Sequence, residues 1–132
     1  MSTRRRVIVV APRVAAVHPE KVRRIALSAT SGGLDLPAYR AADWREEYRR
    51  TYPTAASWIT DSVPDHSAMM AGIAAPTLLL WADSDPISPL PAGEHLARLL
   101  PRAMLRVIRG ASHGFARDQP RLVASWIAAH LA

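Results

Sequence analysis

One strand-length stretch constrains the fold of this chain more than any other feature. Residues 76–81 read Pro-Thr-Leu-Leu-Leu-Trp, a continuous apolar run without polar alternation. A strand with one face in water alternates between apolar and polar side chains, whereas a strand covered on both faces does not. The run therefore predicts a buried strand in a parallel sheet that has helices on both of its faces.

The remaining patterns fit the same class. Strands are predicted at residues 22–29 and 104–108, helices at 36–52, 92–100 and 120–131, short helices broken at Pro64 over 54–72, and a helix or a short strand at 7–17. In the 36–52 segment Trp44, Tyr48 and Tyr52 recur at a spacing of four, and Asp118 is the predicted N-cap of the last helix. We expect an α/β fold of about three parallel strands with flanking helices. Residues 1–132 form a single domain in this interpretation, with a lid-like insertion at 34–72.

Composition narrows the range of partners. The formal net charge is +6, and every basic residue except Lys21 is an arginine. The arginines are scattered and no tract combines dense charge with aromatic residues, which argues against a nucleic-acid partner. There is no cysteine and the five histidines lack metal-ligand spacing, so no metal or cofactor is implied. No apolar stretch approaches the roughly 18 residues of a membrane span, and we expect a soluble cytoplasmic protein.

Two loops are predicted to carry the chemistry. Residues 83–91 follow the buried strand, and residues 110–118 follow the next strand. Active sites of parallel sheets lie beyond the carboxyl ends of the strands, where these two loops would be neighbours. One loop holds aspartates and the other holds His113. A carboxylate that orients an imidazole is the acid–base half of a nucleophilic hydrolase.

The segment APTLLLWADSDPISP (residues 75–89) resembles the strand and acid loop of the α/β-hydrolase family, and VIRGASHGF (107–115) resembles its histidine loop. VAAVHPEKVRRIALSATSGG (14–33) is similar to the helix, turn and strand that follow the family's nucleophile elbow. The resemblance implies that Asp85, rather than Asp83, is the triad acid and that His113 is the general base.

The nucleophile of that family stands in a G-x-S-x-G elbow between a strand and a helix. The resemblance places this elbow near residues 4–7, where the chain has no glycine. Residues 110–114 do match the pattern, but Ser112 is rejected as a nucleophile for two reasons. Residues 115–119 separate it from the predicted helix start, and His130 lies roughly 15 Å along that helix.

Two functions stay open. The first is a hydrolase-family protein, incomplete or inactive, which retains Asp85 and His113. It would act on a small-molecule substrate if a complementary N-terminal hydrolase chain supplied the nucleophile. The second is a non-catalytic assembly module whose 22–29 strand has an exposed edge, through which the chain would form a homodimer or bind another chain. Trp44, Tyr48, Trp58 and Met69–Met70 are expected to pack mainly in the core, although they could line a pocket.

Overall fold

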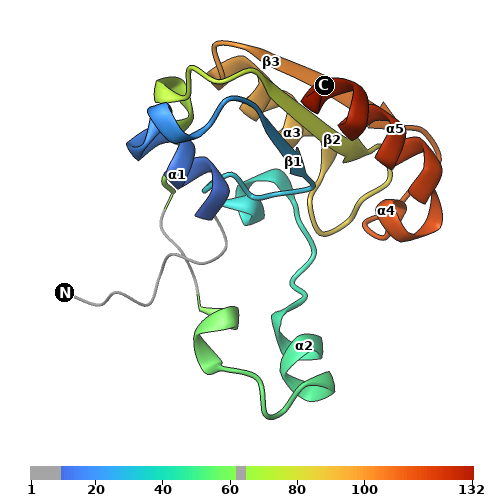
Figure 1. Ribbon diagram of the computed structural model, residues 1–132. Coiled ribbons are helices and arrows are strands. Elements are labelled where there is room, and N and C mark those ends of the chain that lie inside the picture. The colour runs from blue at the N-terminus through green and yellow to red at the C-terminus, as the bar shows by residue number, and fades with distance from the viewer. Residues whose placement is uncertain (1–9, 62–64) are drawn as a thin grey trace.

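The computed structural model describes residues 10–61 and 65–132, which fold around a three-stranded sheet. The strands are β1 (Ile25–Ser28), β2 (Thr77–Ala82) and β3 (Ala103–Ile108), and they lie in the order β1-β2-β3. Both pairings are parallel, so all three carboxyl ends meet at one edge of the sheet (Figure 1). The predicted α/β class with about three parallel strands is confirmed.

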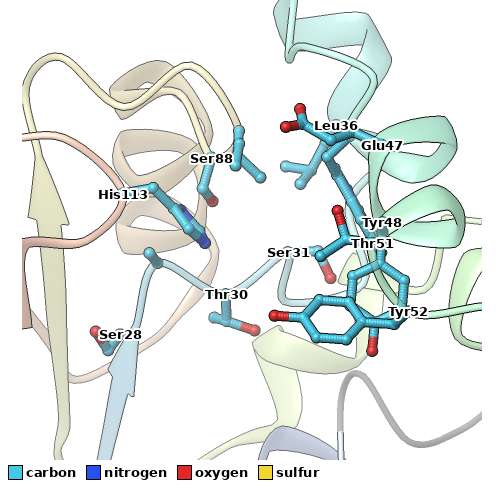
Figure 2. A pocket seen from close by; sticks show the side chains of 13 residues that line it. Ser28, Thr30, Ser31, Leu36, Glu47, Tyr48, Thr51, Tyr52, Ser88 and His113 are labelled. Atoms are coloured by element: carbon cyan, nitrogen blue, oxygen red, sulfur yellow. The ribbon is translucent and has the colours of Figure 1, made fainter. Parts of the chain in front are cut away.

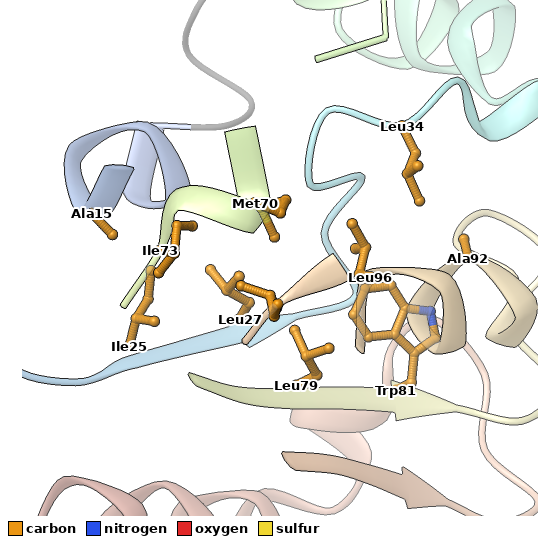
Figure 3. Close-up of a cluster of buried hydrophobic side chains, with 11 residues drawn as sticks. Ala15, Ile25, Leu27, Leu34, Met70, Ile73, Leu79, Trp81, Ala92 and Leu96 are labelled. Atoms are coloured by element: carbon orange, nitrogen blue, oxygen red, sulfur yellow. The ribbon is translucent and has the colours of Figure 1, made fainter. Parts of the chain in front are cut away.

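The central strand explains the apolar run that dominates the sequence. Every residue of β2 is buried, and its side chains alternate between two separate cores. Leu79 and Trp81 point into a cluster that is shared with α1 and α3 (Figure 3). Leu78 and Leu80 point to the opposite face, where Phe115 and Val123 cover them. A strand with a core on each side needs apolar residues at every position.

Helices cover both faces of the sheet. On one face lie α1 (Val10–Val17) and α3 (Leu90–Leu99), and on the other lie α4 (Phe115–Asp118) and α5 (Pro120–Leu131). The remaining elements are η1 (Pro19–Lys21), η2 (Leu36–Tyr39), α2 (Arg45–Thr51), η3 (Ser57–Thr60) and η4 (Ser67–Gly72). In Figure 1 α2 and the segment after it extend away from the sheet.

The single helix predicted over residues 36–52 is wrong. The structure has a short 3₁₀ turn, η2, followed by the separate helix α2. Arg40 ends the first element in the left-handed conformation, at φ 61°. The carboxylate of Asp43 then accepts a hydrogen bond from the Arg45 N–H at 3.1 Å, which favours a new helix start. Local backbone chemistry therefore outweighs the aromatic spacing.

Two details of the helix ends differ from the sequence prediction. Asp118 is not the N-cap of α5, because it ends the short helix α4 and Gln119 takes the cap position without a side-chain hydrogen bond. Pro12 does not interrupt the first helix, because it lies in the first turn of α1, where a missing N–H is tolerated. Of the 7–17 run, residues 7–9 lie outside the described residues, as does the predicted break at Pro64.

Candidate active site at the carboxyl ends of the strands

The acid loop after β2 is built around Asp85. Its side chain is fully buried, and its Oδ1 accepts hydrogen bonds from the backbone N–H groups of Ile87 at 2.8 Å and Ser88 at 2.9 Å. The aspartate thus closes the turn and fixes its own carboxylate in one orientation. Oδ2 remains available for a further partner.

That partner is His113 in the loop after β3. Its Nδ1 lies 2.8 Å from Asp85 Oδ2, while 44% of its side chain remains exposed. An ionised carboxylate only accepts hydrogen bonds, so Nδ1 carries the proton when the ring is neutral, and the lone pair then lies on Nε2. The structure thus brings together the two residues that the sequence singled out, with the basic nitrogen facing away from the acid.

A second set of contacts joins the two loops. The carboxylate of Asp83 accepts a hydrogen bond from the Gly110 N–H at 2.9 Å, and the Ser84 N–H donates to the Ala111 carbonyl at 3.0 Å. Asp83 is exposed and does not contact the imidazole. The choice of Asp85 over Asp83 as the partner of His113 agrees with this geometry, in which Asp83 holds the loops in register.

The buried indole of Trp81 is hydrogen-bonded to the acid loop. Its Nε1–H donates to the Ser88 carbonyl at 2.9 Å, so the last turn of the loop is tied to the central strand. The ring packs directly on Gly93 of α3, where a Cβ atom would lie 2.5 Å from Trp81 Cδ2. A glycine is required at that position because the helix backbone approaches the ring so closely.

His113 lines a pocket of about 690 Å³. One wall comes from the end of β1 and the turn after it, residues 28–31, together with Ile87 and Ser88 of the acid loop. The facing wall comes from α2 and its flanks (Figure 2). The Ser88 hydroxyl is buried and has no hydrogen-bond partner among the described residues.

The α2 wall corrects one expectation and adds residues that the sequence reasoning missed. No residue of α2 is buried, and the flanking Trp44 and Tyr52 are also outside the core, so this aromatic series faces the pocket. Glu47 and Thr51 line the same wall and were missed. Their spacing from Trp44, at three and seven positions, was a usable signal, since such residues share one helix face. Met70, by contrast, is fully buried in the core.

The structure changes one of the two arguments against Ser112 as the nucleophile and agrees with the other. A helix does follow its turn directly, because α4 begins at Phe115. Ser112 is exposed and is not among the residues that line the pocket. His130 Nε2 lies 3.1 Å from the carbonyl of Ile25, the first residue of β1, which is the opposite end of the sheet from the acid loop.

Some features expected from the sequence either lie outside the described residues or can be checked only within them. The position predicted for the elbow, residues 4–7, lies outside them. Within residues 10–61 and 65–132, no group of three or more His, Asp or Glu side chains is arranged to hold a metal ion. No helix in those ranges is both long and apolar enough to cross a membrane.

A comparison with known protein families shows which family the chain belongs to. A family model described as TAP-like protein, of the α/β-hydrolase type, matches residues 42–132, which include both loops of the site. The chain belongs to this TAP-like group of α/β-hydrolases. The resemblance inferred from the strand, acid-loop and histidine-loop motifs is confirmed at the level of the family.

Solved structures agree on the fold. Rv0554 from Mycobacterium tuberculosis is 18% identical with a TM-score of 0.71, covering 94% of this chain and 61% of its own. The serine hydrolase of carbazole degradation, CarC, is 15% identical with a TM-score of 0.73 and has 59% of its length covered. A metagenomic α/β-hydrolase from sediments of the Mar Chica lagoon, Morocco, is 23% identical with a TM-score of 0.61, covering 92% of this chain and 57% of its own. This hydrolase-family chain therefore spans about three fifths of the length of the structures it matches.

Proposed function

We propose that Asp85 and His113 form the acid–base half of a hydrolase active site whose nucleophile comes from a segment that pairs with the outer edge of β1, which no strand among the described residues covers. The observation that carries the proposal is the 2.8 Å contact between His113 Nδ1 and Asp85 Oδ2. It combines a buried, doubly anchored carboxylate with an imidazole that borders a pocket.

The chemistry follows from the tautomer that this contact favours. With its proton on Nδ1, His113 offers the Nε2 lone pair to a hydroxyl and can take up its proton as the oxygen attacks a carbonyl. Asp85 keeps the ring oriented and stabilises the imidazolium that forms. The same imidazolium then returns the proton to the leaving group. The reaction class is acyl transfer to water, with an ester or a similar carbonyl compound as the substrate class.

The edge of β1 offers a position for the segment that carries the nucleophile. Ile25 and Ala29 direct their N–H groups to the carbonyls of Pro76 and Leu80 on the β2 side. In a parallel ladder the alternate residues, Ala26 and Ser28, direct their backbone groups the other way. Among the described residues β1 pairs with β2 alone, so no strand pairs with these outward-facing groups. A strand paired there would end beside the pocket, because Ser28 is both the last residue of β1 and a pocket residue.

An activated ester tests the acid–base role on the chain itself. The Nε2 lone pair of a competent His113 attacks p-nitrophenyl acetate, p-nitrophenolate leaves, and water hydrolyses the acyl-imidazole. We expect His113→Ala to lower the rate several-fold. His18→Ala is the matched control, because His18 also faces a carboxylate, Glu20 at 3.6 Å, but lies outside the pocket. Equal rates for the wild type and His113→Ala would overturn the proposal.

A fluorophosphonate probe tests where the nucleophile lies. We expect no adduct on Ser112 by intact mass and peptide mapping, since this side chain does not border the pocket. A His113-dependent adduct on Ser112 would contradict an externally supplied nucleophile. Such an adduct on Ser28, Ser31 or Ser88, which line the pocket, would contradict it as well and would identify the nucleophile directly.

The outer edge of β1 also favours the second candidate function, assembly. Unpaired strand edges bind other strands, and a second copy of this chain offers the same edge for a symmetric pair. Light scattering across a concentration series measures this. The assembly hypothesis predicts a dimer that dissociates on dilution, and a monomer at every concentration would refute the homodimer.

A further inference from the structure

The pocket has a wall whose chemistry differs from the rest of the protein surface. Five residues of α2 and its flanks line it, and they recur at the spacing of one helix face: Trp44, Glu47, Tyr48, Thr51 and Tyr52. A helix face with three aromatic rings would ordinarily pack into a core. Here no residue of α2 is buried, so the aromatic face is presented to whatever enters the pocket.

The rings on this wall form a continuous series. Trp44 and Tyr48 meet edge to face with centroids 5.5 Å apart, and Tyr48 and Tyr52 follow at 4.9 Å. The negative potential of an aromatic face attracts cations. The Trp44 ring already attracts one, since the Arg45 guanidinium carbon lies 5.6 Å from its centroid. Arg45 is not among the residues that line the pocket but lies beside it, and within the part of the chain that the structure describes no arginine or lysine stacks on the rings of Tyr48 and Tyr52.

The wall formed by α2 and its flanks carries a negative charge at Glu47. Among residues 10–61 and 65–132, Glu47 is the only acidic residue that lines the pocket, and no lysine or arginine from these ranges lines it, although the chain carries a net charge of +6. The other charged residues of α2, namely Arg45, Glu46, Arg49 and Arg50, do not line the pocket. Among the lining residues that the structure describes, an anionic ligand would therefore meet the Glu47 carboxylate and no lysine or arginine.

We propose that this pocket takes ligands with a compact apolar or aromatic body and a cationic amine or ammonium group, and that it discriminates against anions. The amine lies near Glu47 and the tyrosine rings, and the body spans toward His113 on the facing wall (Figure 2). This inference rests on the proposed function, because it assigns the substrate class of the same site. It makes α2 the element that determines specificity.

Binding, rather than turnover, tests the inference. Three probes share a phenyl body and differ in charge: phenethylamine, 2-phenylethanol and 3-phenylpropionate. Each is titrated into the isotope-labelled protein at neutral pH and low salt, and dissociation constants are read from NMR shifts of pocket residues. We expect phenethylamine to bind about tenfold more tightly than 3-phenylpropionate, with 2-phenylethanol between them, as an exposed carboxylate beside partly exposed aromatic rings allows.

Matched variants assign the effect to Glu47. Glu47→Gln should weaken phenethylamine about threefold and leave 2-phenylethanol unchanged, and added salt should reduce the same difference. Glu46→Gln, one residue away and outside the pocket, should change neither. Equal or tighter binding of 3-phenylpropionate would overturn the inference, as would equal effects of the two variants.

The outcome is separable from that of the hydrolase proposal. His113→Ala removes the base but leaves Glu47 and the aromatic series in place, so it should preserve the preference for phenethylamine. Charge-selective binding with an ester rate that is insensitive to His113 would refute the hydrolase role alone. A His113-dependent ester rate without charge selection would refute the specificity inference alone.

Discussion

The substitution Asp85→Asn isolates the charge of the acid loop while keeping its shape. An asparagine can keep Oδ1 as the acceptor for the Ile87 and Ser88 N–H groups. Its amide nitrogen then replaces Oδ2 opposite His113 Nδ1. Because an amide nitrogen only donates, Nδ1 must become the acceptor, and the proton of the neutral ring moves to Nε2.

The expected cost can be worked out from these contacts. Hydrogen bonds to a charged group contribute roughly 1.5–3 kcal/mol each, against about 0.5–1.5 kcal/mol for neutral ones. Asp85 accepts three such bonds with a fully buried side chain, but the neutral amide is also easier to desolvate. We therefore expect a net loss of about 1–2 kcal/mol in the free energy of unfolding.

Urea unfolding measures this loss, with Asp83→Asn as the control. Asp83 is an exposed residue of the same loop that accepts a bond from Gly110, so its substitution should cost no more than about 0.5 kcal/mol. The ester-cleavage rate of Asp85→Asn should fall toward that of His113→Ala, because Nε2 no longer offers a lone pair. An Asp85→Asn protein with unchanged stability and an unchanged rate would refute the reasoning.

Three further predictions concern the surroundings of the site. Gly93→Ala should destabilise the protein by about 1–3 kcal/mol despite the better helix propensity of alanine, because the added Cβ would lie 2.5 Å from Trp81 Cδ2. Thermal unfolding measures this loss, with Gly72→Ala as the control, because a Cβ at Gly72 would contact nothing within 4 Å. Ser88→Ala should leave the free energy of unfolding unchanged or raise it by up to about 1 kcal/mol, since it removes a buried hydroxyl that has no hydrogen-bond partner among the described residues. A clear decrease in the free energy of unfolding, measured with urea, would contradict this prediction. The hydrogen bonds from the Ser67 hydroxyl and N–H hold the pKa of Asp65 below its usual 3.8. The folded state therefore gains its full stabilisation from this carboxylate above pH 3.8 and loses it as the pH falls through the lowered pKa. An acid titration below pH 3.8 should show a steeper loss of folding stability for the wild type than for Asp65→Asn.

The sheet and the neighbouring positions of the two loops could be predicted from the sequence for physical reasons. The run ending at Trp81 is typical of a strand with a core on each face, and parallel strands place their following loops at a common edge. The order of the elements then placed the two loops side by side, whereas the choice of Asp85 over Asp83 came from the resemblance of the loop to the α/β-hydrolase acid loop.

The features that escaped prediction depend on competition between local and distant contacts. Trp44, Tyr48 and Tyr52 gave a helical period, but their spacing could not tell whether that face meets a core or a pocket. The break at Arg40 needed a left-handed residue that is not glycine, which no simple pattern signals. The hydrogen bond from the Trp81 indole to the Ser88 carbonyl is a tertiary contact that no sequence motif predicts.

The proton position on His113 in the wild-type protein tests the central claim most directly. Two-dimensional NMR of ¹⁵N-labelled histidine, at a pH where the ring is neutral, distinguishes the two tautomers. The account predicts a proton on Nδ1, hydrogen-bonded to Asp85, and a free lone pair on Nε2, as a general base requires. A neutral ring with its proton on Nε2 would contradict the claim that this pair is the acid–base half of a hydrolase.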